Sequence, residues 1–310
     1  MRVLITGATG FIGRALVLRL QRDRHAVSAW VRDPAKARIV LGPDVALHPA
    51  GGPEGWRTAL SGAGAVVNLA GEPIFGKRWT AARRRALIES RVALTARLAD
   101  AIAALPPEAR PRVLVSASAV GWYGDRGDET LTEESAPGTG FLADLCRAWE
   151  EAARRAEAAG VRVALPRIGL VLGPGGGALA AMLPAFRWGL GGPLGSGLQH
   201  VPWIHLEDAV ESIAAALTDD RYRGPFNAVA PDPVPQGAFA RAVGRAIRRP
   251  AFFPVPGLLL RLAIGGAASA VLSSQCATPR RLLDLGFRFR FANLDAALAD
   301  ILGGADSPPS

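Results

Sequence analysis

The chain opens with MRVLITGATGFIGR, residues 1–14. An apolar run at 3–5 leads directly into a turn that carries Gly7, Gly10 and Gly13, and an apolar helical pattern follows. Glycines in a turn between a buried strand and a helix are typical of dinucleotide sites. Gly7 allows the tight turn, Gly10 lets the backbone approach a pyrophosphate, and Gly13 lets the helix pack closely on the strand. This stretch therefore predicts a nucleotide-binding α/β unit.

The helix after the turn supplies the rest of the predicted phosphate site. Its first N–H groups have no partner within the helix, and its positive dipole end attracts phosphate. We predict that the cofactor contacts Gly7, Thr9, Gly10, Phe11, Ile12 and Gly13. The spacing G-x-x-G-x-x-G differs from the commoner G-x-G-x-x-G, and an ordinary strand–turn–helix is the alternative interpretation.

Arg32 indicates which dinucleotide would bind. It follows a second predicted strand, 26–31, and lies about twenty residues beyond the glycines, where NAD sites carry an acid that binds the ribose 2′-hydroxyl. A guanidinium at this place can bind a 2′-phosphate, which an acid would repel. The position predicts NADP in preference to NAD. The alternative is that Arg32 is one of many surface arginines.

The order of strand and helix patterns predicts the fold class. Further strands are predicted at 45–48, 65–71, 112–119, 161–171 and 224–230. Strands that alternate with helices indicate a doubly wound parallel sheet with helices on both faces, an α/β fold of the Rossmann type. We predict this domain over 1–230, with a substrate-side insertion at 175–200. A smaller, mostly helical domain is predicted over 231–302.

The predicted strand at 65–71 ends in small residues. In doubly wound sheets, ligands bind outside the carboxyl ends of the strands. We therefore predict that Leu69, Ala70 and Gly71 line the cofactor.

Composition limits the partners. The 310 residues carry a formal charge of +9, but only Lys36 and Lys77 are lysines, and the arginines are scattered along predicted helices. No basic strip is interleaved with stacking aromatics, so we predict no nucleic-acid partner. The four histidines lack metal-ligand spacing, and no metal site is predicted.

The two cysteines and the lengths of the apolar runs indicate the cellular compartment of the protein. Cys146 and Cys276 lie far apart in the sequence, which favours packing roles in a reducing compartment. The first apolar run is too short for a signal peptide. The longest apolar stretch, 258–272, is interrupted by Arg261 and is short for a membrane span, so it predicts a buried helix. We expect a cytoplasmic protein with no membrane partner.

The segment TGATGFIG at 6–13 resembles the extended and atypical short-chain dehydrogenase/reductase families, of the NAD-dependent epimerase/dehydratase kind. Three further segments resemble one atypical branch, the uncharacterised "epimerase family" oxidoreductases: NLAGEPI at 68–74, KRWT at 77–80 and FxxxLCxxWE at 141–150. The C-terminal pattern from PVPG to GFRFRF resembles the small C-terminal domain of that branch. The resemblance therefore covers almost the whole chain.

The resemblance implies further site residues. In the extended families, the strand that corresponds to 112–119 ends in a catalytic Ser or Thr, which places Ser118 in that role and Ser116 beside the cofactor. A hydroxyl there would orient a substrate carbonyl for hydride attack, and capping of strand-end backbone groups is the alternative for both serines. Pro166 and Arg167 match a segment that borders the nicotinamide, although Arg167 could equally be a buried ion-pair partner.

The Tyr-x-x-x-Lys pair of those families is missing. The register of the helix at 141–150 puts Leu142 in the place of the tyrosine and Cys146 in the place of the lysine. Neither can exchange the proton or hold the ribose as that pair does. If chemistry survives, Tyr123 or Glu72 is the candidate proton donor, and a rim position is the alternative for each. The resemblance thus implies cofactor binding more directly than turnover.

Two functions of different classes follow. One is an NADP-dependent oxidoreductase or nucleotide-sugar-epimerase-like enzyme that acts on a small polar molecule, with hydride chemistry supplied by the cofactor. The other is a catalytically silent NADP(H)-binding sensor or interaction protein, which suits the cell-division label of some relatives. The missing pair favours the second function, and the polar loop 72–80 with Ser118 and Tyr123 favours the first. We expect an enzyme. No motif names its substrate, and a homodimer is one option for its assembly.

Overall fold

A parallel sheet forms the centre of the protein. The computed structural model describes residues 1–51 and 55–303. The sheet order is β12-β8-β5-β4-β1-β2-β3, with β6 attached to β8, and each neighbouring pair is parallel. The strands are β1 (Arg2–Thr6), β2 (Ala26–Val31), β3 (Ala46–Pro49), β4 (Ala65–Asn68), β5 (Val113–Ser116), β6 (Ser118–Ala119), β8 (Arg162–Ile168) and β12 (Gly224–Ala228). The predicted doubly wound sheet is confirmed.

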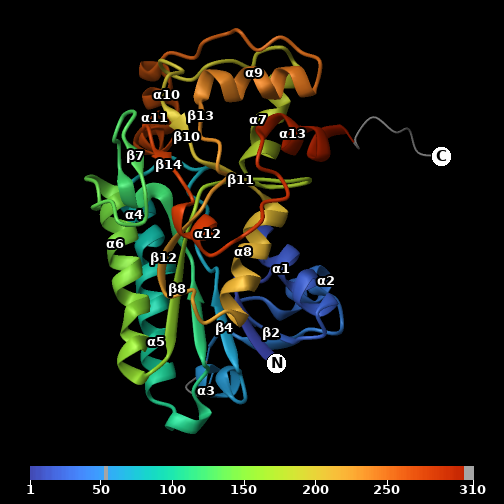
Figure 1. Cartoon of the computed structure of the whole chain (residues 1–310), viewed down its shortest axis with the longest axis vertical. Coiled ribbons are helices and arrows are strands. Elements are labelled where there is room, and N and C mark those ends of the chain that lie inside the picture. Colours follow the sequence, from blue (N-terminus) through green and yellow to red (C-terminus); the bar gives the residue numbers. More distant parts are fainter. Residues whose placement is uncertain (52–54, 304–310) are drawn as a thin grey trace, which may run out of the picture.

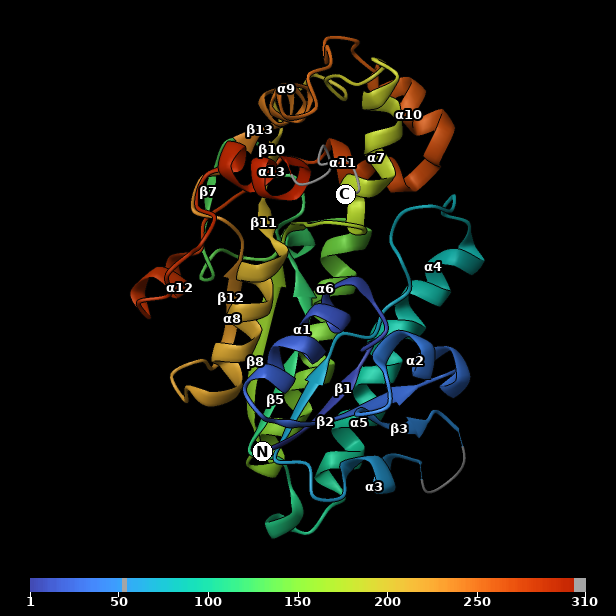
Figure 2. The ribbon, with the colours of Figure 1, turned by 90° about the vertical axis from the view of Figure 1, so that its right-hand side faces the viewer.

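Helices cover both faces of this sheet, as Figures 1 and 2 show. One layer holds α1 (Phe11–Arg22), α2 (Pro34–Leu41) and α8 (Leu206–Thr218), and the other holds α3 (Gly55–Leu60), α5 (Leu94–Ala103) and α6 (Phe141–Arg154). Each face of the sheet has its own hydrophobic core, because successive side chains of a strand point to opposite faces. Val3 and Ile5 of β1 pack in the core under the first helix layer, and Leu4 packs in the core under the second.

The helical segment that follows the 72–80 loop contains a wider turn. It consists of α4 (Ala81–Ile88), a π-helical turn η1 (Glu89–Ala93) and α5. A π-helical turn inserts one residue into the α-helical hydrogen-bond ladder, so it rotates the following side chains relative to the preceding ones.

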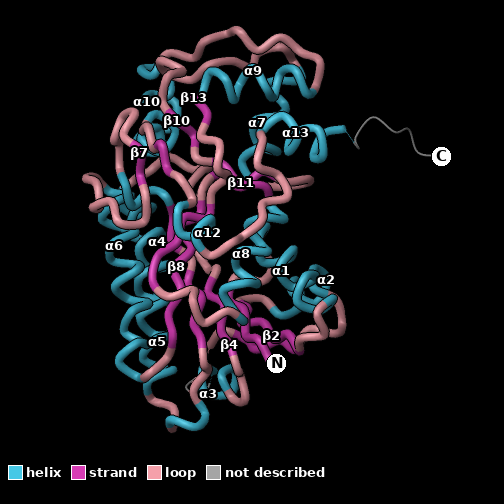
Figure 3. The backbone as a smooth tube through the Cα atoms, in the orientation of Figure 1, coloured by secondary structure: helices cyan, strands magenta, loops and turns pink. Residues whose placement is uncertain are grey.

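A smaller, mostly helical region lies beyond the carboxyl ends of the strands (Figure 3). Its elements are β9 (Leu170–Leu172), α7 (Gly177–Arg187), β10 (His200–Val201), β11 (Trp203–His205), β13 (Val234–Pro235), α9 (Gln236–Ala246), α10 (Gly257–Ile264), η5 (Gly265–Ala268), α11 (Ser269–Leu272) and α13 (Leu294–Gly303). The helix α12 (Arg280–Asp284) instead packs beside β12, with Leu282 in the core of the sheet. The remaining short elements are β7 (Thr130–Leu131), β14 (Cys276–Ala277), η2 (Pro107–Ala109), η3 (Val120–Tyr123) and η4 (Arg155–Ala159). Phe186 of α7 shares one core with Phe239 of α9 and Leu298 of α13, so the insertion at 175–200 packs with the C-terminal segment.

The prediction of a buried helix at 258–272 is wrong. The apolar run breaks at Gly265 into α10, η5 and α11, and α10 has no buried residue. Leu258 is 68% exposed, because α10 lies at the outer end of the small region, where no described segment covers it. Within the described ranges, no helix combines the length and the apolar character that crossing a bilayer requires.

Candidate functional site

The turn from β1 to α1 can be built only with glycine at two of its positions. Gly7 has a φ of +72°, and a Cβ there would lie 2.6 Å from the Leu69 carbonyl oxygen at the end of β4. A Cβ at Gly13 would lie 2.2 Å from the Gly7 carbonyl oxygen. The turn therefore packs directly against the end of β4, at the point where the strand order reverses. Ligands of open α/β sheets bind at such a point.

The start of α1 fits an anion. Gly10 is the N-cap residue and supplies no side-chain acceptor, and the first helical turn carries no acid. Thr9 and Gly10 are exposed. The first N–H groups of α1 therefore have no partner within the helix and face an open, uncharged turn, which suits a diphosphate.

Phe11 contributes its backbone to this turn and its ring to packing. A Cβ at Gly176 would lie 2.4 Å from Phe11 Cδ2, and one at Gly177 would lie 2.8 Å from Phe11 Cε1. The glycine-rich loop 173–177 thus closes onto the ring at the start of α1. The prediction of a substrate-side insertion at 175–200 did not include this contact with the phosphate turn.

Arg32 forms an ion pair over the end of β1. Its Nη1 lies 3.2 Å from Glu72 Oε1, and its side chain is 87% exposed. The other carboxylate oxygen of Glu72 lies 3.0 Å from Arg83 Nη1. Since β2 and β4 flank β1, the Arg32–Glu72 pair crosses from one side of the phosphate turn to the other. Arg83, and then Arg32, lower the pKa of the Glu72 carboxyl, so it is ionised at neutral pH.

This ion pair bears on the predicted roles of Glu72 as a proton donor and of Arg32 as a ligand of the 2′-phosphate. A residue that donates a proton to the substrate must lie near the nicotinamide, whereas Arg32 is predicted to bind the 2′-phosphate at the opposite end of the cofactor. Glu72 lies against Arg32, so the two predicted roles exclude each other. If Arg32 binds the 2′-phosphate, Glu72 lies at the adenosine end of the cofactor.

The π-helical turn η1 supports the segment that follows β4. Ser90 Oγ accepts a hydrogen bond from the Glu72 backbone N–H at 3.1 Å, and Arg91 Nη2 donates to the Glu72 carbonyl oxygen at 2.9 Å. Arg91 is buried, with its guanidinium 5.3 Å from the Trp149 ring centroid. A Cβ at Gly71 would lie 3.0 Å from its Cζ. Sequence reasoning did not single out Arg91 as a site residue, because a π-helical turn has no recognisable pattern.

A buried network joins the strand ends beneath the site. Thr6 Oγ1 donates to Asn68 Oδ1 at 2.6 Å, and Asn68 Nδ2 donates to Ser116 Oγ at 3.0 Å and to Thr95 Oγ1 at 2.8 Å. Ser116 is fully buried. Its hydroxyl therefore aligns β4 with β5 and does not reach the surface where a cofactor would lie. By contrast, Leu69 and Ala70 are half-buried at the strand end, as the prediction for them requires.

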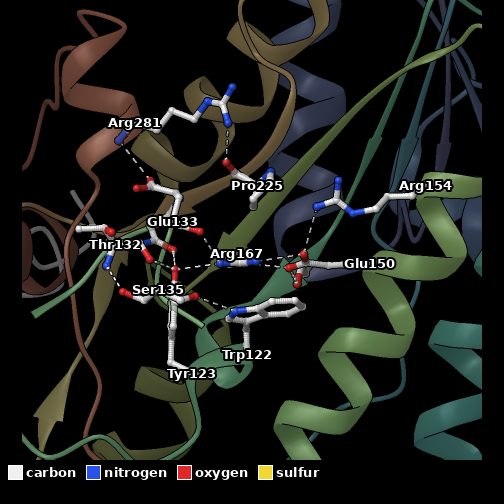
Figure 4. A network of polar contacts seen from close by, with 12 residues as sticks. Trp122, Tyr123, Thr132, Glu133, Ser135, Glu150, Arg154, Arg167, Pro225 and Arg281 are labelled. Carbon is white, nitrogen blue, oxygen red and sulfur yellow. Dashed lines mark hydrogen bonds and ion pairs between the residues drawn. The ribbon is translucent and has the colours of Figure 1, made fainter. Parts of the chain in front are cut away.

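Ser118 and Arg167 meet on one buried carboxylate. Ser118 Oγ donates to Glu150 Oε1 at 2.7 Å, and Arg167 binds both Glu150 oxygens, at 2.8 and 3.1 Å. Figure 4 shows Glu150 and Arg167 side by side, with Arg154 3.7 Å from the same carboxylate. The Arg167 and Glu150 side chains are 2% and 1% exposed. Arg167 is therefore the buried ion-pair partner of the alternative interpretation, and Pro166 is a buried residue of β8.

Tyr123 is fully enclosed by protein groups. Its hydroxyl oxygen lies 2.6 Å from Asn227 Oδ1 and 3.0 Å from the Thr132 carbonyl oxygen, and it accepts a hydrogen bond from Arg167 Nη1 at 3.1 Å. Burial raises the pKa of the phenol. Its hydroxyl has no solvent-facing side from which a ligand could take a proton, so the geometry supports a structural role for Tyr123.

The face of α6 that would carry the missing pair is apolar. A Cβ at Gly121 would lie 3.3 Å from Leu142 Cβ and 3.4 Å from Cys146 Sγ. Burial raises the pKa of the Cys146 thiol to about 12, so the thiol stays protonated at neutral pH. Leu142 and Cys146 pack against Gly121 of η3 and offer no acid or base in the place of the missing pair.

Comparisons with known proteins agree with this arrangement. Residues 3–228 match the NAD dependent epimerase/dehydratase family, and residues 255–301 match a domain of unknown function, DUF1731. The "Epimerase family protein SDR39U1 homolog, chloroplastic" of Arabidopsis thaliana is 44% identical over 97% of this chain and 87% of its own length. YfhF of Bacillus subtilis is 34% identical over 97% of this chain and 98% of its own length.

Solved structures show the same likeness. The human epimerase family protein SDR39U1 (isoform 2), crystallised with NADPH, is 35% identical, with a TM-score of 0.87 over 98% of this chain and 99% of that one. MoeE5, crystallised with UDP-glucuronic acid and NAD, is 24% identical with a TM-score of 0.78, which shows the fold alone. The resemblance inferred from the sequence is confirmed: the chain belongs to the NAD-dependent epimerase/dehydratase family and is an atypical short-chain dehydrogenase/reductase.

Proposed function

We propose that this protein is an NADP-dependent oxidoreductase of the epimerase family that acts on a small polar molecule. One observation carries the proposal: the start of α1, which has no side-chain cap, and the exposed Arg32, which follows the neighbouring strand β2, lie at the same edge of the sheet. A diphosphate and a 2′-phosphate need this pair of anion sites. The human relative crystallised with NADPH supports the choice of cofactor, while MoeE5 was crystallised with NAD.

The chain's own residues would hold the cofactor in three places. The N–H groups at 11–13 would bind the diphosphate, and the Arg32 guanidinium would bind the 2′-phosphate. The backbone at 69–71 would border the ribose, since it lies against Gly7 at the adjoining strand end. When bound, NADPH supplies a hydride.

Ser118 is 2% exposed and its own proton points to the arginine-paired Glu150 carboxylate, so it would not donate a hydrogen bond to the substrate carbonyl. The lone pairs of its Oγ would accept a hydrogen bond from a hydroxyl beside the reacting carbonyl. Glu150 is a positioning residue in this scheme, because it acts only through Ser118.

A second function is favoured by the burial of Tyr123 and the apolar face of α6. With no acid or base at those positions, the protein would bind NADP(H) as a catalytically silent sensor or interaction protein. Its two free cysteines suit a reducing compartment such as the cytoplasm under either function.

Titration and turnover separate the two functions. NADPH fluorescence is expected to change on addition of the protein, and a panel of carbonyl substrates is expected to include one that oxidises the cofactor, with the rate reduced in Ser118→Ala. If NADPH binds but no carbonyl oxidises it, and Ser118→Ala and Tyr123→Phe leave the role in cells intact, the sensor is the correct function. If NADPH does not bind at all, both proposals fail.

A further inference from the structure

Large apolar side chains protrude from one end of the small region. Trp188 is 82% exposed, Leu258 is 68% exposed and Phe252 is 65% exposed. Leu190, Phe253 and Leu262 are exposed with them. We call these six residues the apolar end. Exposed apolar side chains that gather at one end of a protein mark an interaction site in many cases.

Backbone contacts bring the parts of the apolar end together. The Val255 N–H donates to the Pro193 carbonyl oxygen at 2.8 Å, and the Phe253 N–H donates to the Gly191 carbonyl oxygen at 3.4 Å. The loop after α7 therefore runs beside the segment 250–256, and α10 begins directly after that segment. Figures 1 and 2 both place these parts at the end of the molecule furthest from α3.

The charge around the apolar end has one sign. Residues 158–206 and 233–283 contain no Asp or Glu. Arg187, Arg248, Arg249 and Arg261 are exposed there, and none of them forms an ion pair with a described acid. The exposed tryptophan, phenylalanines and leucines thus lie on segments whose charged side chains are all arginines.

We propose that the apolar end docks peripherally on an anionic lipid surface. Trp, Phe and Leu side chains flanked by arginines insert at the boundary between headgroups and acyl chains, while the arginines bind lipid phosphates. Protruding side chains suit this boundary, whereas protein hot spots lie in well-packed pockets. The proposal differs from the expectation of no membrane partner, and docking of this kind needs only a shallow apolar surface.

A second copy of this chain fits the apolar end less well. Two copies that met symmetrically through this face would oppose arginines to arginines, and the segments that carry the apolar end contain no acid to offset them. An anionic bilayer removes that repulsion and covers the apolar side chains at the same time.

Vesicle flotation of the full chain tests the proposal. The protein is expected to float with phosphatidylcholine vesicles that contain phosphatidylglycerol and to remain unbound with phosphatidylcholine alone. Arg248→Gln with Arg249→Gln should weaken partitioning by on the order of 20-fold, and added salt should weaken it further. Trp188→Ala with Phe252→Ala should weaken it by roughly tenfold or more.

Ile39→Ser is the matched control, because Ile39 of α2 is 87% exposed but lies outside the apolar end. It should bind vesicles like the unmodified chain, and the thermal midpoints of all variants should agree, since every changed side chain is exposed. The proposal is overturned if the chain binds neither vesicle at low salt, or if Ile39→Ser weakens binding as much as the Trp188 and Phe252 changes. Light scattering that shows a dimer dissociated by those changes would also overturn it, as would an acidic protein that occupies the face in place of lipid.

Discussion

Arg32 and Glu72 lie in the segments that follow β2 and β4, on opposite sides of β1, and form an ion pair, 3.2 Å from Nη1 to Oε1, over the phosphate turn. The arginine that would bind a 2′-phosphate is therefore already held by a carboxylate. A bound 2′-phosphate would have to compete with Glu72 for this guanidinium.

Arg32→Asp should weaken the binding of NADPH far more than the binding of NADH. The change removes a cation from the 2′-phosphate and adds an anion, at a cost of about 1–3 kcal/mol for NADPH. Fluorescence titration with each dinucleotide measures the ratio. Arg22→Asp, an exposed arginine at the far end of α1, should leave the ratio unchanged. Equal losses for the two dinucleotides would contradict the assignment of Arg32.

Glu72→Gln should strengthen NADPH binding severalfold, because it frees Arg32 and removes a negative charge beside the 2′-phosphate. Arg83→Met should do the opposite, since Glu72 would then pair with Arg32 alone. In the Glu72→Gln background, Arg83→Met should have no further effect. A loss that persists in the double variant would mean that Arg83 contacts the nucleotide directly.

The Glu72 ion pairs should make stability depend on pH in the acid range. The folded-state pKa of Glu72 is lowered, so its contribution is complete above the ordinary carboxyl pKa of roughly 4.3 and is lost as the pH falls through the lower, folded value. Since Glu72 is partly exposed, the contribution should be below about 1 kcal/mol. Urea unfolding of the unmodified chain and of Glu72→Gln should differ at neutral pH and converge in acid. A difference that grows in acid would contradict this sign.

Arg167→Met should destabilise the fold by about 3–5 kcal/mol, because it leaves the Glu150 carboxylate buried without its main cation. Arg154→Ala is the matched control: Arg154 lies 3.7 Å from the same carboxylate but is 38% exposed, so its loss should cost less than about 1 kcal/mol. The free energy of unfolding in urea measures both. Equal costs for the two changes would show that the buried pair is not the main partner of Glu150.

Gly176→Ala should weaken NADPH binding and destabilise the fold by about 1–3 kcal/mol, because the new Cβ would lie 2.4 Å from Phe11 Cδ2 and displace the start of α1. Shortening the ring side chain to Leu in Phe11→Leu should recover part of both losses in the double variant. If Gly176→Ala alone changes neither quantity, the loop does not constrain the phosphate turn.

Local patterns in the sequence determined the parallel sheet and its phosphate turn. The apolar run, the glycines and the following helical period at 1–22 are set by interactions between near neighbours, so they can be recognised without the rest of the chain. The same holds for Arg32, whose place depends only on its distance from the glycines. The absence of the Tyr-x-x-x-Lys pair was also recognisable, because the resemblance to the family sets the register that puts Leu142 and Cys146 in those places.

Tertiary structure alone decided the roles of the charged and hydroxyl groups. Glu150 meets Ser118 and Arg167, and Glu72 meets Arg32, only because separate strands and helices converge, and no spacing in the sequence encodes those distances. The apolar stretch that begins at Leu258 misled the prediction for a related reason. Hydrophobicity indicates that a segment can be buried, but whether another element covers it depends on how the whole chain packs.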